Sequence, residues 1–286
     1  MVEDIIQTTI LNGDVVLSGP TLFTGFSSKI RIITSEEFDG VYFRRLDLPC
    51  SGLIKATLEN VYKTPRTTII GNGEASVVLI EHLMATLYAF GIKKCLVEVE
   101  GPEVPIGDGS AIHFVDAILN VGVRKQTKRL FTSILEEHAY AQDNQEILAK
   151  PSRDLAINYK LAYLNEPLLN QQYSFKFCLD KFIEDIAPCR TFALKTDVDY
   201  MVHTQHLKGN SLDYGVVVHD SKVLNPGGLR FEDEMARHKI LDFLGDFALS
   251  GLDLGMEVFS VRAGHQINVS FAKELKRKLK GKLNES

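Results

Sequence analysis

The side chains best suited to chemistry lie on one predicted helix between Asn225 and Gly251, in the stretch NPGGLRFEDEMARHKILDFLGDFALSG. Apolar residues recur there at helical spacing, and His238, Asp242 and Asp246 follow one another every four residues, so these three project from one side. An imidazole and a carboxylate one turn apart on a helix can bind the same metal ion. A metal needs at least one further ligand, and the alternative is a surface histidine with two solvated acids.

A second polar pair interrupts a long apolar stretch, ASVVLIEHLMATLYAFGI, which runs from Ala75 to Ile92. Its content of Ala, Leu and Met predicts a buried helix over this range. Glu81 and His82 are its only charged or imidazole side chains, and burial of an unpaired carboxylate is costly, so both need partners or water. The alternative is a core histidine bonded to a backbone carbonyl, with Glu81 reaching solvent.

The two predicted helices together offer the ligands of a hydrolytic metal site. His82, His238 and Asp242 would supply three protein ligands to zinc and leave the fourth position to water. Such a metal lowers the pKa of its water and polarises a carbonyl group. Glu81 precedes His82, so its side chain points about 100° away around the helix. It is therefore a poor ligand, but it is well placed to accept a proton as a general base.

A complementary acid is predicted near the C-terminus, where Gly264 precedes His265 after a strand and a turn. A carboxylate that holds an imidazolium lets the ring protonate a leaving nitrogen. We therefore expect His265 to act as a general acid and Asp246 to hold its ring.

The composition of the 286-residue chain argues against several classes of protein. A net charge of −5 argues against bulk binding of nucleic acid, which needs a basic face. The four cysteines form no C-x-x-C pair, so we expect neither a cysteine zinc site nor a disulfide framework, and a reducing cytoplasm fits. The acidic start lacks the pattern of a signal peptide, and no run reaches the ~18 apolar residues of a membrane span. We therefore expect a cytoplasmic protein without a transmembrane segment.

The order of predicted elements is similar in the two halves of the chain. Each half begins with strands and continues with two helices that are separated by a strand. We expect an α+β fold of two layered domains, each a mainly antiparallel sheet packed on two helices, with the helical layers facing each other. The first domain would cover residues 1–126 and the second residues 127–286, with a strand–helix–strand insert at about residues 193–221. The metal site would then lie at the domain interface, a usual place for a ligand cleft.

Five stretches, taken in order, resemble one known enzyme family: IEHLMATLYAFGI, EVPIGDGSA, RTF, VLNPGGLRFEDEMARHKILDFLGD and AGHQIN. They are similar to the UDP-3-O-acyl-N-acetylglucosamine deacetylase family, the zinc amidases of lipid A biosynthesis, and the resemblance runs from about Gly13 to Leu275. It implies that the protein releases acetate from the 2-acetamido group of a UDP-linked 3-O-acyl glucosamine, a committed step of that pathway. It also implies one Zn²⁺ per chain, which Fe²⁺ can replace in the cell, in a bacterial enzyme that we expect to be a monomer.

The resemblance implies roles for further residues. It assigns the metal ligands, the base and the acid as above, and it implies that the Thr191 hydroxyl hydrogen-bonds the carbonyl oxygen as this becomes an oxyanion. Lys239 would face the diphosphate of the substrate, and Arg262 stands where the family has a basic residue near that group. Four further residues would bind the substrate or wall the passage for its acyl chain: Phe192, Val198, Leu207 and Val217.

Two positions depart from the family pattern. The family usually has His in a Leu-His-Thr/Ser-Gly turn near the N-terminus, where this chain has Phe23. The residue two before Glu81 is usually Ser or Thr in the family, where this chain has Leu79. Neither belongs to the inferred metal set, so we expect the two departures to affect affinity for the substrate and not the chemistry.

Two alternative functions stay open: a zinc amidase that acts on another acylated amino sugar, and a metal-free module that binds a nucleotide or a lipid. The basic stretch KELKRKLKGK, from Lys273 to Lys282, could make weak contact with the anionic surface of the inner membrane. The alternative interpretation of that stretch is a solvated helix face.

Overall fold

The computed structural model describes residues 8–64, 66–125, 131–208 and 212–285, with side chains as far as residue 279. The first half contains a five-stranded sheet in the order β2 (Val15–Pro20), β3 (Ser27–Thr34), β9 (Cys95–Val99), β4 (Val41–Arg45) and β5 (Ile54–Lys55). Within it β4 and β9 are parallel, and the other neighbouring pairs are antiparallel. Along β3 the buried Ile30 and Ile32 alternate with exposed basic residues, as expected for a sheet with one covered face.

The second half repeats this plan. Its sheet has the order β12 (His138–Gln142), β13 (Gln145–Pro151), β19 (Leu254–Val261), β14 (Leu155–Leu161) and β15 (Gln171–Lys176), and β11 (Thr132–Ser133) pairs with β19 off this path. The neighbours β14 and β19 are parallel, as β4 and β9 are in the first sheet, and the other pairs along the path are antiparallel. The similarity that the order of elements predicts is therefore present in the strand topology.

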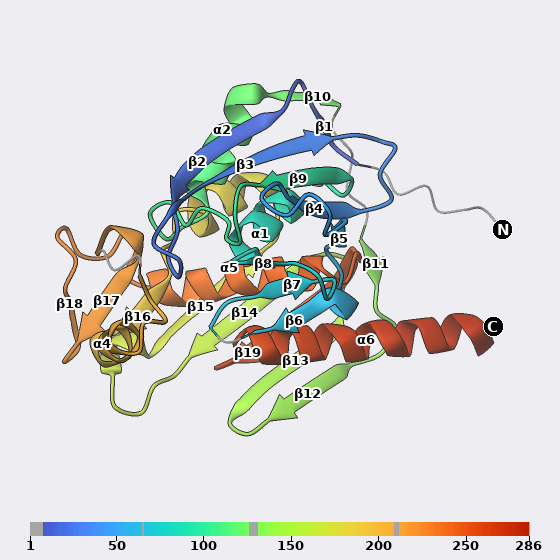
Figure 1. Ribbon diagram of the computed structural model, residues 1–286. Coiled ribbons are helices and arrows are strands. Elements are labelled where there is room, and N and C mark those ends of the chain that lie inside the picture. Colours follow the sequence, from blue (N-terminus) through green and yellow to red (C-terminus); the bar gives the residue numbers. More distant parts are fainter. Residues whose placement is uncertain (1–7, 65, 126–130, 209–211, 286) are drawn as a thin grey trace.

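Two helices pack against each other between the sheets. They are α1 (Glu81–Phe90) and α5 (Glu234–Ala248), and Figure 1 shows both in the middle of the molecule. They approach each other closely at Gly245, where an added Cβ would lie 2.0 Å from the carbonyl oxygen of Glu81. With α2 (Ile112–Val121) and α6 (His265–Glu285), these helices confirm the predicted α+β class. The expected domain boundary after residue 126 lies outside the described residues, and the division into two domains stays a prediction.

The helix predicted from Ala75 begins later than expected. Ser76–Val78 forms strand β8, because its β-branched valines suit a sheet, and α1 begins only at Glu81. Leu79 lies between the two with a φ of 64°, a left-handed conformation that separates strand from helix. The helix prediction is wrong for this part because a short apolar run is equally typical of a strand. As a consequence, Glu81 and His82 lie in the first turn of α1.

Each half carries an insert immediately before its first long helix. In the first half the insert is a three-stranded sheet in the order β6 (Val61–Lys63), β7 (Ile69–Gly71) and β8. In the second half, β16 (Phe192–Leu194), α4 (Lys195–His203) and β17 (Val216–His219) form the predicted strand–helix–strand unit, which β18 (Lys222–Val223) extends. Figure 1 shows this second insert at one end of the molecule, away from the C-terminus.

The remaining elements are short. β1 (Ile10–Leu11) pairs with β10 (Val123–Lys125). The short helical segments are η1 (Leu58–Asn60), η2 (Pro167–Leu169), α3 (Leu179–Lys181), η3 (Phe182–Ile186) and η4 (Leu212–Tyr214). In the described part of the chain, no helix combines the length and the apolar character that crossing a membrane requires.

Candidate metal centre and active site

The three predicted metal ligands meet at one point, although they come from two helices. His82 lies in the first turn of α1, and His238 and Asp242 lie one turn apart on α5. The Oδ1 atom of Asp242 is 3.4 Å from His238 Nε2 and 3.8 Å from His82 Nε2. One ligand atom from each residue lies within 4.8 Å of the others, and all three side chains are buried.

The chemistry of this cluster fits a divalent metal ion. The Oδ1 atom of Asp242 is buried between two imidazole rings, and it has no hydrogen-bond partner among the described residues. A buried unpaired carboxylate oxygen is costly, and a cation held between these atoms removes that cost. His238 Nδ1 is 3.1 Å from the carbonyl oxygen of Cys189, so this nitrogen carries the proton and Nε2 is free to bind a metal.

The charges of the three side chains also suit a metal. Burial and the neighbouring His238 lower the pKa of His82 to about 3, and burial lowers the pKa of His238, so both rings are neutral. Burial opposes ionisation of Asp242, but the attraction of the Lys239 ammonium outweighs it and holds the pKa of this carboxyl well below its usual range. Lys239 Nζ donates to Asp242 Oδ2 at 2.8 Å, which leaves Oδ1 for the metal. Two neutral imidazoles and one carboxylate form a common donor set for a hydrolytic metal.

Glu81 lies beside this cluster, and both of its carboxylate oxygens accept hydrogen bonds. Oε1 accepts one from Thr67 Oγ1 at 2.7 Å, and Oε2 accepts one from the backbone N–H of Thr68 at 3.0 Å. Burial raises the pKa of Glu81 to about 7, against the attraction of the nearby His265. A carboxylate with a pKa near neutrality can accept a proton during a reaction and release it afterwards.

His265 begins α6 and faces the same space. Its Nε2 is 3.7 Å from Glu81 Oε1, and its Nδ1 is 2.9 Å from Asp246 Oδ2. Burial disfavours the charged ring, but the carboxylates of Asp246 and Asp242 outweigh it and raise the pKa of His265 to about 9. The ring is therefore an imidazolium at neutral pH and can donate a proton. The structure thus brings together the predicted acid, its carboxylate partner and the predicted base.

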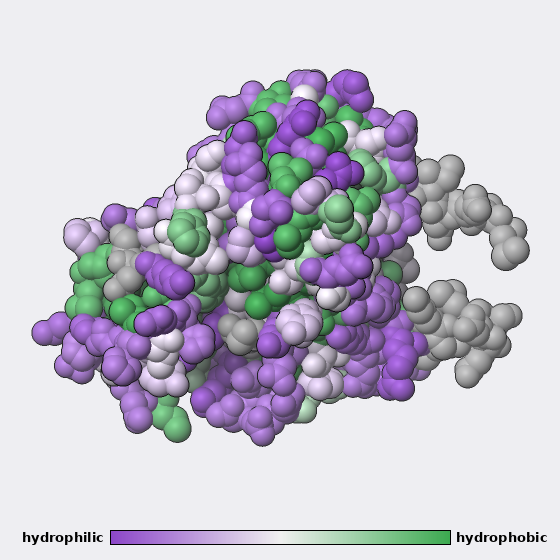
Figure 2. Space-filling model, in the orientation of Figure 1, coloured by the Kyte–Doolittle hydropathy of each residue, from purple (hydrophilic) through white to green (hydrophobic). Residues whose placement is uncertain are grey.

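A pocket of about 690 Å³ opens over these groups, and both halves of the chain line it. Much of its wall comes from the second insert, on which Figure 2 shows apolar side chains at the left of the view. A space of this size with a few polar groups at its base is typical of a small-molecule site. The lining includes all four residues predicted to bind the substrate or wall its acyl chain: Phe192, Val198, Leu207 and Val217.

A comparison with known protein families agrees with these features. A model of the family described as UDP-3-O-acyl N-acetylglycosamine deacetylase matches residues 7–277. The chain belongs to this family. The resemblance based on five short stretches is thereby confirmed, and the protein is a deacetylase, an enzyme that hydrolyses an amide.

Relatives that carry the deacetylase name are similar over most of their length. The UDP-3-O-acyl-N-acetylglucosamine deacetylase of Geobacter sp. (strain M21) is 38% identical over 272 residues, which are 95% of this chain and 89% of that protein. The deacetylase of Geotalea uraniireducens (strain Rf4) is 37% identical over 271 residues, which are 94% of this chain and 88% of that protein. The deacetylase of Chlamydia pneumoniae is 35% identical over 270 residues, which are 93% and 95% of the two chains.

Two residues singled out by the deacetylase resemblance differ in where they lie. Thr191 lines the pocket, and its backbone is held at both ends: its N–H donates to Gly109 O, and its carbonyl accepts from Val216 N–H, each at 2.7 Å. Arg262 is not among the lining residues, and its backbone N–H donates to the carbonyl oxygen of Lys160. Thr191 is therefore within the pocket as expected, whereas contact of Arg262 with a substrate stays a prediction.

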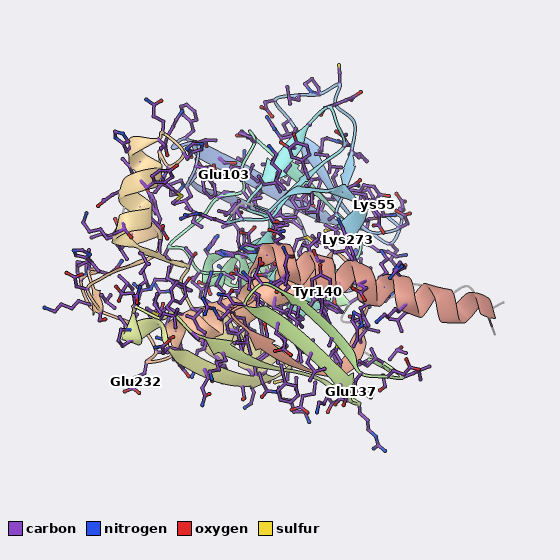
Figure 3. All side chains as sticks on the ribbon, turned by 90° about the horizontal axis from the view of Figure 1, so that it is seen from below. Lys55, Glu103, Glu137, Tyr140, Glu232 and Lys273 are labelled. Carbon is purple, nitrogen blue, oxygen red and sulfur yellow. The ribbon has the colours of Figure 1, made fainter. Side chains whose placement is uncertain are left out.

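Both departures from the deacetylase pattern line the pocket. Phe23 and Leu79 each place an apolar side chain in its wall, where the family usually has a polar one. The turn that carries Phe23 is held by Glu103, which Figure 3 labels. Its carboxylate accepts hydrogen bonds from the backbone N–H groups of Leu22, Phe23 and Thr24. The departures therefore change the polarity of the pocket wall, and Glu103 still fixes the shape of the turn.

Three residues that contact Glu81 or Asp246 have no role in the sequence analysis: Thr67, Thr68 and Asn268. Asn268 Nδ2 donates to Asp246 Oδ2 at 2.9 Å. Its spacing of three residues from His265 on α6 is a signal that could have found it, because such neighbours share a helix face. Thr67 and Thr68 show only the β-branched pattern of a strand, which carries no functional signal.

Proposed function

We propose that the protein is a zinc-dependent amidohydrolase that removes the acetyl group from the 2-acetamido nitrogen of UDP-3-O-acyl-N-acetylglucosamine. The product is acetate, and the reaction is a committed step of lipid A biosynthesis. The observation that carries the proposal is the convergence of His82, His238 and Asp242 around an unpaired carboxylate oxygen, with Glu81 and His265 beside it. Family membership supports this substrate, because the matched relatives are named for it.

His82, His238 and Asp242 would hold one metal ion per chain. Zinc is proposed because two imidazoles and one carboxylate are typical ligands of zinc in hydrolases, although Fe²⁺ accepts the same donors. Once bound, the metal supplies Lewis acidity, which polarises the acetyl carbonyl and lowers the pKa of a water molecule.

Two side chains would transfer protons. Glu81, with a pKa near 7, accepts the proton of the attacking water. His265, held as an imidazolium by Asp246, donates a proton to the departing amine nitrogen. The 3.7 Å between the two groups supports their action on one bound amide. Thr191 would donate its hydroxyl to the carbonyl oxygen as negative charge develops there.

The rest of the substrate would occupy the pocket. Lys239 would face the diphosphate, and its ammonium lies 5.5 Å from the centre of the Phe192 ring as well as beside Asp242. Arg262 is proposed as a second cation for the same group. The acyl chain would follow the apolar wall of the second insert, which includes Val217.

The cellular compartment and the oligomeric state of the protein are proposals. We infer that the protein works in the cytoplasm, whose reducing conditions fit the four free cysteines of the chain. We also infer that it is a monomer. The basic stretch lies on α6, whose end extends away from the body in Figures 1 and 3 and which carries the labelled Lys273. Weak contact of this helix with an anionic membrane surface stays a prediction.

The test is acetate release from UDP-3-O-acyl-N-acetylglucosamine by the purified protein, with its metal content measured in parallel. Glu81→Gln should lower kcat by at least ~100-fold, because the base is lost. The metal content should stay at about one ion per chain, because Glu81 is not a ligand. Glu74→Gln changes an exposed glutamate in a turn and serves as the matched control, with both values unchanged. Full turnover by Glu81→Gln would show that the base is another group.

The same assay separates the alternative functions. Removal of the 3-O-acyl chain from the substrate should slow the reaction, because the apolar wall of the pocket then has nothing to bind. Indifference to that chain favours an amidase for another amino sugar. Protein that binds no divalent metal in any preparation favours a metal-free binding module.

A further inference from the structure

Two neighbouring threonines of the first half contact the proposed base, and one of them also contacts Asp246, the carboxylate partner of the proposed acid. Thr67 and Thr68 immediately precede β7 in the first insert, and they are buried, with 2% and 0% of their surface exposed. The Thr67 hydroxyl donates to Glu81 Oε1 at 2.7 Å, and the Thr68 N–H donates to Glu81 Oε2 at 3.0 Å. One dipeptide therefore holds both oxygens of the proposed base.

The Thr68 side chain reaches the second half of the molecule. Its hydroxyl donates to Asp246 Oδ1 at 2.5 Å. The other oxygen of this carboxylate, Oδ2, accepts from His265 Nδ1 and from Asn268 Nδ2, each at 2.9 Å. Because a carboxylate fixed at both oxygens cannot rotate, the bond from Thr68 determines the direction in which Asp246 holds the imidazole ring.

We propose that Thr68 is a positioning residue that couples the general base to the general acid. Its backbone N–H holds Glu81, its hydroxyl holds Asp246, and together these bonds maintain the 3.7 Å separation of Glu81 Oε1 and His265 Nε2. Thr68 itself does not line the pocket, so it acts through the residues that it holds. This inference rests on the proposed function, because it assigns a role within the same reaction.

The experiment compares Thr68→Val, which keeps the shape and removes the hydroxyl, with Thr68→Ser, which keeps the hydroxyl. In the metal-loaded protein, Thr68→Val should lower kcat roughly 10- to 100-fold, the effect of one lost hydrogen bond to a charged group. KM should change by less than about threefold, because Thr68 does not touch the substrate. Thr68→Ser should restore kcat to within a few-fold. If the buried threonine had only a structural role, kcat would not fall at a nearly constant KM, and serine would not restore kcat.

A second measurement needs no turnover. The Nδ1 proton of His265, which lies in the hydrogen bond to Asp246, can be followed by proton NMR as a low-field signal. The signal should shift in Thr68→Val and stay in place in Thr68→Ser. Thr8→Val is the matched control, because the Thr8 hydroxyl is also buried and hydrogen-bonded, but to the backbone of Thr9, Lys93 and Lys94.

The outcomes distinguish this inference from the proposed function. Unchanged kcat in Thr68→Val, or failure of Thr68→Ser to restore it, overturns the role of Thr68 while the function stands. If the unsubstituted protein releases no acetate, the proposed function fails, and the imidazole signal still tests the link. If Thr68→Val does not fold, Thr68→Cys keeps the volume with a weaker donor, and an unshifted signal in that variant overturns the proposal.

Discussion

Two acids in one buried site differ in charge because their neighbours differ. Burial opposes the ionisation of Asp242, but the ammonium of Lys239 and the imidazolium of His265 keep it ionised and available to a cation. Glu81 is held by two neutral donors, from Thr67 and Thr68, so burial dominates and its pKa rises to about 7. Both side chains are carboxylates, so their residue types do not show which one binds a metal and which one accepts a proton. Their surroundings determine these roles.

These pKa values predict a bell-shaped dependence of kcat/KM on pH. The base must be unprotonated, so activity should rise as the pH passes about 7, where Glu81 loses its proton. The acid must be protonated, so activity should fall above about pH 9, where His265 loses its proton. Asp246→Asn removes a carboxylate that raises the pKa of His265, and the alkaline limb should move down by about one unit or more.

The measurement is kcat/KM from about pH 5 to pH 10, over the range in which both groups titrate. Asp116→Asn, which changes an exposed acid on α2, is the control and should leave both limbs in place. An alkaline limb that does not move in Asp246→Asn would mean that it reports a group other than His265.

At the scale of elements, the two halves share a sheet plan, and each half adds an insert at the same point of that plan. The first insert, β6–β7–β8, carries the threonines that hold the base, and the second, from β16 to β18, walls the pocket. Each insert precedes the helix of its own half that supplies metal ligands, α1 in the first half and α5 in the second. The close crossing of α1 and α5 then brings those ligands together, and Gly245 permits it because any side chain there would overlap the Glu81 carbonyl.

Gly245→Ala should therefore damage both stability and the site. The added Cβ would lie 2.0 Å from a backbone oxygen that cannot move without shifting α1. We expect the free energy of unfolding to fall by roughly 1–3 kcal/mol or more, together with a loss of metal affinity. Urea denaturation and metal titration measure the two effects. Gly13→Ala, at an exposed glycine whose added Cβ meets only one side-chain atom at 4.0 Å, should have little effect, and equal midpoints for the two variants would contradict the crossing argument.

At the scale of the whole molecule, the site depends on contacts between the halves. The buried core is one continuous cluster that includes residues of both sheets and of α1 and α5. Polar contacts also join the halves: Arg230 donates to Asp108 at 2.6 Å, and Lys93 pairs with Asp253. A ligand that contacts both halves therefore binds only when the entire chain is folded.

A metal ion should accordingly stabilise the whole chain against unfolding. With metal at about 100 times its Kd, the free energy of unfolding should exceed that of chelator-treated protein by about 3 kcal/mol, because the unfolded chain has no assembled site. His82→Ala in the first half and Asp242→Asn in the second should each abolish this gain, whereas Asp116→Asn should keep it. Thermal or urea unfolding with and without Zn²⁺ measures the gain. If it persists in Asp242→Asn, the metal binds elsewhere.

Some features follow from the sequence by itself because they depend on neighbours along the chain. His238 and Asp242 share one side of α5 because residues four apart lie one turn apart. The strand–helix–strand insert and the α+β class follow from hydrophobic periodicity and turn residues, which are also local. The order of the short motifs was sufficient to predict the family.

Only the tertiary structure decided which distant residues meet. His82 reaches the pair on α5 through the crossing at Gly245, and Thr68 joins the base to the partner of the acid. The start of α1 at Glu81 was also decided there, because β8 pairs with β7 and takes residues that otherwise fit a helix. Contacts of this kind depend on how buried faces pack, and many arrangements of the same local elements satisfy one hydrophobic pattern equally well.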